Sequence, residues 1–308
     1  MKRSSFLALV LLGVCFFGCS PHAHAASQGI AVSPFQQTVT IQPTDTEKTF
    51  DITVTNNTPT VQDLSLRAVD FGSLNDTGGL VLEGSDSKYS QRYGLASWMT
   101  LGTDTVVLGA GETQTVPITI TNRQTLQPGG HYGAVVVKVN SLDDQSGNKV
   151  VINQQVLSLV LVDKVGGEKY DLKLVGMTEN GNWLHLPTKV QLRFQNPGNV
   201  HVLPRGTVEL QSPSGTVLSK GIINSESAFV LPESFRTIPV SLTPVGKSFP
   251  LPGLYKIVVK YRYEGITASA TKRYYIRFIN LPAYLFVIVL AMGVVLYIRK
   301  RRTKKASK

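Results

Sequence analysis

Short alternating runs of apolar and polar residues fill the chain between residues 26 and 280. Residues 50–55 alternate strictly, and residues 116–121 repeat the pattern. A period of two is typical of a β-strand with one buried face, and the Gly, Pro and Asn clusters between the runs mark turns. Only residues 87–99 allow a helix. The pattern therefore predicts an all-β fold of the sandwich type.

Two local patterns recur along this region. A strand runs into an asparagine and a turn at Asn56, Asn122 and Asn196. A Pro-Gly turn leads through a tyrosine into a valine-rich strand at 128–137 and again at 252–259. This repetition predicts two consecutive Ig-like β-sandwich domains of similar plan.

We place the N-terminal Ig-like domain at 26–165 and the C-terminal Ig-like domain at 168–279, because a valine-rich strand stops at two glycines between them. Each length is sufficient for a hydrophobic core. The only cysteines, Cys15 and Cys19, precede both domains. Disulfides, thiolate metal sites and a cysteine nucleophile are therefore excluded from the two domains.

Residues 1–25 have the features of a cleavable signal peptide. Basic residues precede an apolar run at 6–17, and residues 23–25 read Ala-His-Ala, a small-x-small cleavage site. The apolar run is short for an uncleaved membrane anchor. A bacterial lipoprotein is the other interpretation, because Gly18-Cys19 matches part of a lipobox.

A second apolar segment, 281–298, holds 18 residues without a charge. At about 1.5 Å rise per residue, a helix of this length covers roughly 27 Å, close to the hydrocarbon thickness of a bilayer. Tyr284 and Tyr297 near its ends suit a membrane interface, and the basic residues of 299–308 suit a cytoplasmic tail. The sequence therefore predicts a single-pass cell-membrane protein with a C-terminal transmembrane helix and an extracytoplasmic N-terminal region.

The formal net charge of +11 depends largely on the two ends of the chain. Seven positive charges lie in 299–308 and two at Lys2 and Arg3, which leaves +2 for the rest. A basic chain often binds nucleic acid. Here membrane topology explains the charge, so no nucleic-acid partner is expected.

Catalytic and cofactor motifs are missing from the sequence. It has no nucleophile elbow, zinc-protease helix, P-loop or dinucleotide fingerprint. His131, His185 and His201 stand far apart, and no ligand spacing demands a metal. We therefore expect no catalytic residues, no cofactor, no metal site and no enzyme activity. The acids that a fold can still bring together are Asp70, Asp76, Asp86 and Asp144.

The long segment 70–98 stands where a sandwich normally has a short connection. Extended loops on rigid sandwiches commonly carry recognition. Lys88, Tyr89, Arg92 and Tyr93 form an aromatic and basic group within it. Tyrosine and arginine dominate many interfaces, so these four are the candidate partner-binding residues. An insertion without function is the alternative.

Several segments resemble the WxL-interacting protein family of Gram-positive cell surfaces. Residues 30–34 resemble the opening of the family's first strand. Residues 108–120 resemble its turn and strand before the central loop, and residues 128–137 resemble its glycine-rich strand entry. Residues 194–206 resemble an N-x-G-N-x-H element of membrane-anchored surface domains. The resemblance covers most of the chain in layout. It implies two Ig-like domains, a membrane anchor and association with peptidoglycan.

These features together predict a non-enzymatic, membrane-anchored bacterial cell-surface adaptor. Its Ig-like domains would bind cell-wall peptidoglycan or another surface protein, and their edge strands would accept a strand from the partner. Two alternatives stay open: an accessory subunit of a membrane transport or secretion assembly, and a hydrolase with an unrecognised acidic site.

Overall fold

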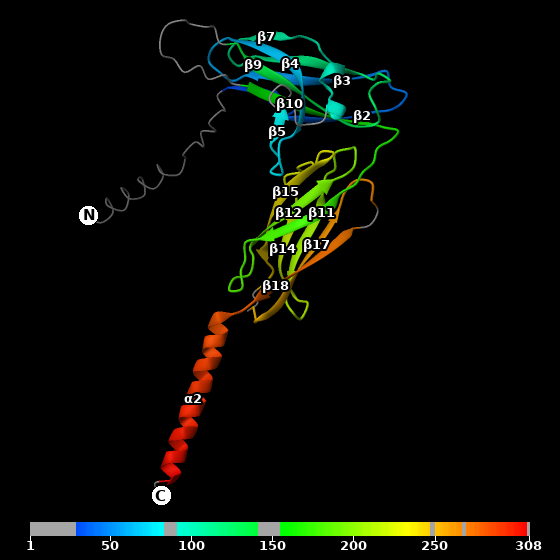
Figure 1. Cartoon of the computed structure of the whole chain (residues 1–308). Coiled ribbons are helices and arrows are strands. Elements are labelled where there is room, and N and C mark those ends of the chain that lie inside the picture. The colour runs from blue at the N-terminus through cyan, green and yellow to red at the C-terminus, as the bar shows by residue number, and fades with distance from the viewer. Residues whose placement is uncertain (1–28, 83–90, 141–154, 247–249, 267–268, 307–308) are drawn as a thin grey trace, which may run out of the picture.

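The computed structural model describes residues 29–82, 91–140, 155–246, 250–266 and 269–306. Figure 1 shows two β-rich bodies in succession and a helix that leads away from the second body to the C-terminus. The fold is mostly β-sheet, as the alternating pattern predicts, and each body is an Ig-like pair of sheets. The residue boundaries of the two domains stay a prediction, and the predicted signal peptide lies outside the described residues.

The N-terminal sandwich consists of two facing sheets. Its strands are β1 (Ile30–Ser33), β2 (Gln36–Ile41), β3 (Glu47–Asn56), β4 (Gln62–Ser73), β5 (Leu80–Leu82), β6 (Met99–Leu101), β7 (Thr105–Leu108), β8 (Thr113–Thr121), β9 (Gly129–Val139) and β10 (Gln155–Lys164). One sheet has the order β1-β3-β8-β6. The other has the order β2-β10-β9-β4-β5, with β7 also paired to β4. β1 pairs with β3 in the first sheet, whereas β2 pairs in parallel with β10 in the second, so the chain changes sheets between β1 and β2.

An apolar core fills the space between these sheets. Ile52 and Val54 on β3 and Ile118 on β8 are fully buried, and they pack with Val135 and Val160 from the opposite sheet. On β3 and β8 the neighbouring residues in the sequence are more exposed. This is the period of two that the sequence shows.

The C-terminal sandwich repeats the plan with two smaller sheets. Its strands are β11 (Lys173–Glu179), β12 (Lys189–Asn196), β13 (Arg205–Gln211), β14 (Val217–Ile223), β15 (Ser234–Ser241), β16 (Thr243–Pro244), β17 (Gly253–Arg262) and β18 (Ala270–Phe278). The orders are β11-β12-β15 and β16-β14-β13-β17-β18. Leu192 and Phe194 from one sheet and Ile257 and Val259 from the other are fully buried in a separate core.

Buried asparagines explain why a strand repeatedly runs into Asn and a turn. Asn56 ends β3, and its Nδ2 donates to three backbone carbonyls at 2.8, 3.0 and 2.9 Å. Asn196 ends β12 and donates to the carbonyls of Val200 and Val230 at 2.7 and 2.8 Å. Each buried side chain pairs with backbone carbonyls of the neighbouring turn, so it holds the turn beside its strand.

The predicted helix at 87–99 is replaced by two short 3₁₀ turns in its described part. These are η1 (Gln91–Tyr93) and η2 (Ala96–Trp98). Asp70 Oδ1 accepts hydrogen bonds from the backbone N–H groups of Leu95 and Ala96, both at 2.6 Å. A contact between the two ends of the 70–98 segment therefore fixes this local structure.

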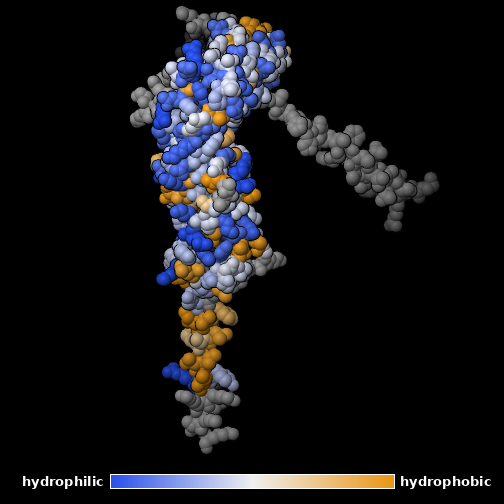
Figure 2. All heavy atoms as spheres, turned by 90° about the vertical axis from the view of Figure 1, so that its right-hand side faces the viewer, coloured by the Kyte–Doolittle hydropathy of each residue, from blue (hydrophilic) through white to orange (hydrophobic). Residues whose placement is uncertain are grey.

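The C-terminal helix α2 (Leu281–Ala306) runs through the apolar segment and on through the basic residues that follow. Figure 2 shows apolar residues gathered along it. Over the residues that the structure describes, no helix is long and apolar enough to cross a membrane. This finding corrects the predictions of a transmembrane helix at 281–298 and of a cell-membrane localisation, whereas the tail at 299–308 stays a prediction.

Candidate functional site

A third apolar cluster joins the two sandwiches. Leu159 on β10, Tyr132 on β9 and Phe71 on β4 are buried, although they lie on the face of their sheet that points away from the first core. The second sandwich contributes Leu231, with Phe229 packed beside it. Both faces of this sheet are therefore covered, and the two sandwiches share an apolar interface.

Aromatic rings from both sandwiches meet in this interface. His201, which follows β12, makes T-shaped contacts with Tyr132 and with Phe229, at centroid distances of 5.7 and 4.8 Å. Tyr132 Oη lies 3.4 Å from His201 Nδ1. His201 is only 5% exposed. Tyr132 and His201 are 69 positions apart, so only the docking of the sandwiches brings them together.

Asp163 on β10 adds a carboxylate to this group. Its Oδ1 lies 3.4 Å from His201 Nδ1, is buried, and makes no hydrogen bond within the described part of the chain. Burial raises the pKa of Asp163 to about 7, with further contributions from Glu168 and Glu264. Burial also lowers the pKa of His201 to about 4. The interface therefore favours the neutral form of both groups.

The described parts of the 70–98 segment contact the second sandwich. Asp76 Oδ2 accepts a hydrogen bond from Arg193 Nε at 2.6 Å, and the Asp76 carbonyl accepts one from the N–H of Thr237 at 2.5 Å. The Arg193 guanidinium also lies 3.9 Å from the centroid of the Phe235 ring. The segment therefore helps to fix the two sandwiches against each other.

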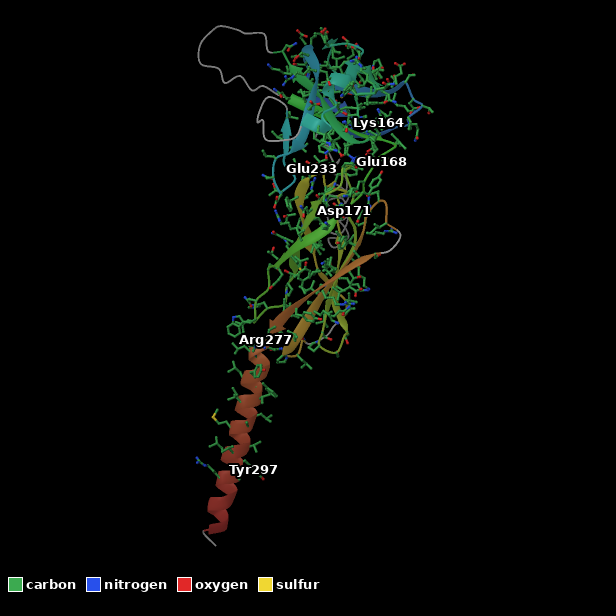
Figure 3. The ribbon with its side chains drawn as sticks, turned by 45° about the vertical axis from the view of Figure 1, so that its right-hand side comes forward. Lys164, Glu168, Asp171, Glu233, Arg277 and Tyr297 are labelled. Carbon is green, nitrogen blue, oxygen red and sulfur yellow. The ribbon has the colours of Figure 1, made fainter. Side chains whose placement is uncertain are left out.

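Two of the four predicted partner-binding residues, Arg92 and Tyr93, lie where the two sandwiches meet. Glu233 is labelled at this junction in Figure 3. Tyr93 Oη donates to Glu233 Oε1 at 2.8 Å, and Arg92 Nη1 lies 3.6 Å from the same oxygen. Burial, together with Glu233, raises the pKa of Tyr93 to about 12. Lys88 and Tyr89 lie outside the described residues. Arg92 and Tyr93 thus contact the protein's own second sandwich, and a role of the four residues toward a partner stays a prediction.

A groove with a volume of about 260 Å³ lies between the sandwiches, beside the apolar cluster. Phe35 at the groove is 64% exposed, and Leu80 is 37% exposed. Arg236 also lines it, donates to the Phe229 carbonyl at 2.8 Å, and has its pKa lowered by burial. The apolar side chains that line the groove are Phe35, Phe71, Leu80, Leu159, Leu161, Ala228, Phe229, Leu231 and Phe235.

The ionisable residues considered in the sequence do not assemble into a metal site. Within the described ranges, no group of three or more His, Cys, Asp or Glu side chains is placed to hold a metal ion. Asp70 accepts backbone N–H groups, and Asp76 pairs with Arg193. Asp86 and Asp144 lie outside the described residues. The expectation that the protein uses no metal or cofactor stays a prediction.

The sequence contains one faint signal of the contact between the two sandwiches. His131-Tyr132 follows the Pro-Gly-Gly turn, and the motif at 194–206 contains His201. Both segments belong to recurring strand elements, and no local pattern predicts the contact between them. Asp163 gave no signal, because one acid near the end of a valine-rich strand resembles an ordinary exposed strand residue.

Comparison with known proteins finds no matching family model and no matching curated protein. Solved structures do match. A chaperone–tip adhesin complex of CFA/I fimbriae is 13% identical, with a TM-score of 0.44, over 80% of this chain and 98% of that one. The class 5 fimbriae chaperone CfaA is 12% identical, with a TM-score of 0.42, over 80% and 98%. A complex of the Salmonella enterica SafA pilin with the SafB chaperone is 11% identical, with a TM-score of 0.38, over 80% and 96%.

These comparisons correct the family inferred from the sequence. The matching structures named above are fimbrial chaperones, and none is a WxL-interacting protein. The motifs behind that resemblance are short turn-and-strand elements, which unrelated Ig-like sandwiches share because they solve the same packing problem. The predicted function of a membrane-anchored adaptor, with a cell-wall or surface-protein partner, is corrected together with the family. The alternative of a membrane-assembly subunit is no better supported.

Proposed function

We propose that this protein is a non-enzymatic binding protein of the chaperone type, which holds an extended apolar segment of another polypeptide at the groove between its two sandwiches. The observation that carries this function is the groove itself: it is lined by apolar side chains from both bodies, and Phe35 stands 64% exposed beside it. Concave, mostly apolar sites with a few polar groups are typical ligand sites.

Exposed backbone beside the groove favours a polypeptide as the occupant. β2 covers the outer edge of β10 from Leu159 onward. Among the described residues, no strand pairs with this edge at Gln155 and Leu157. The Leu159 N–H points toward β2, because it donates to the Phe35 carbonyl. By the alternation of a strand, the N–H and C=O groups of Leu157 point the same way, and within the described ranges no backbone group pairs with them, so a strand from a partner can do so.

The composition of the groove argues against catalysis there. Its described ionisable residues are Glu226 and Arg236, without a histidine, a cysteine or a second carboxylate. General acid–base or nucleophilic catalysis needs such a partner for the reacting group. The groove, and not the distant similarity to chaperones that bind adhesin or pilin subunits, supports this function.

The test is binding of a fluorescein-labelled nonapeptide of alternating valine and threonine to the full chain, followed by fluorescence anisotropy. We expect saturable binding that Phe35→Ser weakens about tenfold, because burying a phenylalanine side chain contributes about 1.5–3 kcal/mol. Val61→Ser is the matched control, since Val61 is 68% exposed and does not line the groove. Absence of binding, or equal weakening by both variants, would show that the groove does not hold such a segment.

A further inference from the structure

The last strand of the second sandwich, β18, has an edge without a partner in the described part of the chain. β18 pairs with β17 from Ala270 to Phe278, and the strand order of the sheet ends there. Along such an edge, every second residue presents its N–H and C=O outward. These groups match the spacing of another peptide backbone, so the edge selects a polypeptide over a lipid or a nucleic acid.

The side chains on the outer face of this sheet are strongly basic. Arg273 and Arg277 lie on this face of β18, and Tyr275 between them lies opposite Lys256 of β17. Figure 3 shows Arg277 at the end of the second sandwich, next to α2. Besides Lys220, the cations of this face are Arg205, Lys256, Lys260, Arg262, Arg273 and Arg277.

This charge is not balanced within the described residues. Glu209 is the one carboxylate among the paired residues of this face, and it lies 3.5 Å from Lys220. Arg205 and Arg262 lie directly opposite each other in the pairing of β13 with β17. Like charges in that position destabilise a sheet. An acidic partner beside β18 would offset the charges of Arg273 and Arg277, whereas a second copy of β18 would bring like charges together.

The opposite face of β18 is apolar toward the C-terminal end of the strand, with the exposed Lys272 near the start of the strand. Tyr274 and Ile276 are partly buried and pack against the second core at its open margin. A strand added beside β18 would place alternate side chains next to this apolar margin and the others next to the cations. The geometry points to one occupant: β18 binds, by strand addition, an extended segment of a partner protein in which acidic and apolar residues alternate. The acidic side chains lie beside Arg273 and Arg277.

β18 belongs to the sheet β16-β14-β13-β17-β18, and no strand of that sheet lines the groove between the sandwiches. A test of binding at β18 therefore gives a result that does not depend on whether the groove binds a polypeptide. Edge strands of many proteins carry basic residues merely to prevent aggregation. The test must therefore separate a protected edge from a binding edge, and pairing of backbones from simple attraction of charges.

The probe is the nonapeptide Glu-Val-Glu-Val-Glu-Val-Glu-Val-Glu, titrated against the full chain. We expect saturable binding and slower amide hydrogen exchange in β18. The same peptide with N-methyl groups on alternate residues keeps its charge but loses backbone donors, and we expect it to bind at least about tenfold more weakly. A Lys-Val peptide of the same length should not bind, because its charges repel Arg273 and Arg277.

Charge reversal in the protein completes the test. Arg273→Glu with Arg277→Glu should abolish binding of the Glu-Val peptide and permit binding of the Lys-Val peptide, with the circular dichroism spectrum unchanged. If the charge reversal impairs folding, the milder pair Arg273→Gln with Arg277→Gln is used instead, and it should also weaken binding of the Glu-Val peptide. The control pair, Lys138→Glu with Lys189→Glu, changes the net charge equally at exposed strand positions and should leave binding unchanged.

Two results would overturn the assignment. Failure of the Glu-Val peptide to bind would mean that the cations only protect the edge. Equal binding of the N-methylated and unmodified peptides, without protection of the β18 amides, would mean that the basic face attracts anions and takes no strand.

Discussion

At the scale of single residues, Asn196 carries several backbone contacts that its strand cannot make. Its Nδ2 donates to two carbonyls, and its Oδ1 accepts the N–H of Gly198 at 2.9 Å. Asn196→Ala leaves these buried groups unpaired, and we expect the free energy of unfolding to fall by about 3 kcal/mol. Chemical denaturation measures this change. Asn182→Ala is the control, because Asn182 is exposed and water replaces its hydrogen bonds; an equal loss there would contradict the explanation.

Asp163 and His201 form the second case at this scale, because their pKa shifts oppose each other. The pKa of Asp163 rises from 3.8 to about 7 on folding. Between these values the folded chain holds a proton that the unfolded chain lacks, so this contribution to stability is lost as the pH rises. The pKa of His201 falls from 6.5 to about 4 on folding. The unfolded chain then holds the extra proton, so this contribution is lost as the pH falls.

We therefore expect the pair to contribute little net pH dependence between about pH 4 and 6.5. His201→Phe leaves only the Asp163 contribution, and its stability should fall as the pH rises from 4 to 7. Asp163→Asn leaves only the His201 contribution, and its stability should rise from pH 4 to 6.5. Thermal unfolding of both variants across this range measures the slopes. Slopes of the same sign in the two variants would refute the assignment.

At the scale of elements, the start of β9 depends on a close approach between the sandwiches. Gly129 has a φ of +123°, and a Cβ there would lie 2.9 Å from the Asn199 carbonyl oxygen. The neighbouring Gly130 N–H donates to that same oxygen at 2.8 Å. β9 and the segment after β12 are thus in contact at a point where only glycine fits.

Gly129→Ala should therefore lower the free energy of unfolding by about 2 kcal/mol more than Gly215→Ala does. Gly215 also has a positive φ, +88°, but a Cβ there meets nothing within 4 Å. The comparison separates the close contact from the backbone strain that both positions share. Equal losses in denaturant titrations would mean that the contact with Asn199 has no cost.

At the scale of the whole molecule, the apolar interface should make the two sandwiches unfold as one unit. Leu231 is 8% exposed and packs against Tyr132 and Leu159 of the first sandwich. Leu231→Asp places a charge in this interface. We expect one calorimetric transition to split into two, and the radius of gyration in X-ray scattering to increase. Leu254→Asp is the control, since Leu254 is 55% exposed on the second sandwich. A single transition in the Leu231 variant would mean that the interface does not couple the sandwiches.

The sequence by itself determined the strands and many of their ends. Alternation over a few residues reports which face of a strand is buried, and this is a local property. The recurring asparagines likewise marked turns, because Asn56 and Asn196 bond to backbone groups close to them in the fold. The recurring short motifs did not identify the family, since turn chemistry is common to many sandwiches.

Only the tertiary structure decided how the two sandwiches meet and what their surfaces expose. Asp163 and His201 lie on separate bodies, and burial in the interface gives both their shifted pKa values. The sequence of the 70–98 segment predicts a recognition loop, yet Asp76 in this segment contacts Arg193 of the second sandwich. The basic face of β18 appears only when strand pairing aligns cations from several strands. Such contacts depend on packing between distant parts of the chain, and no local pattern encodes them.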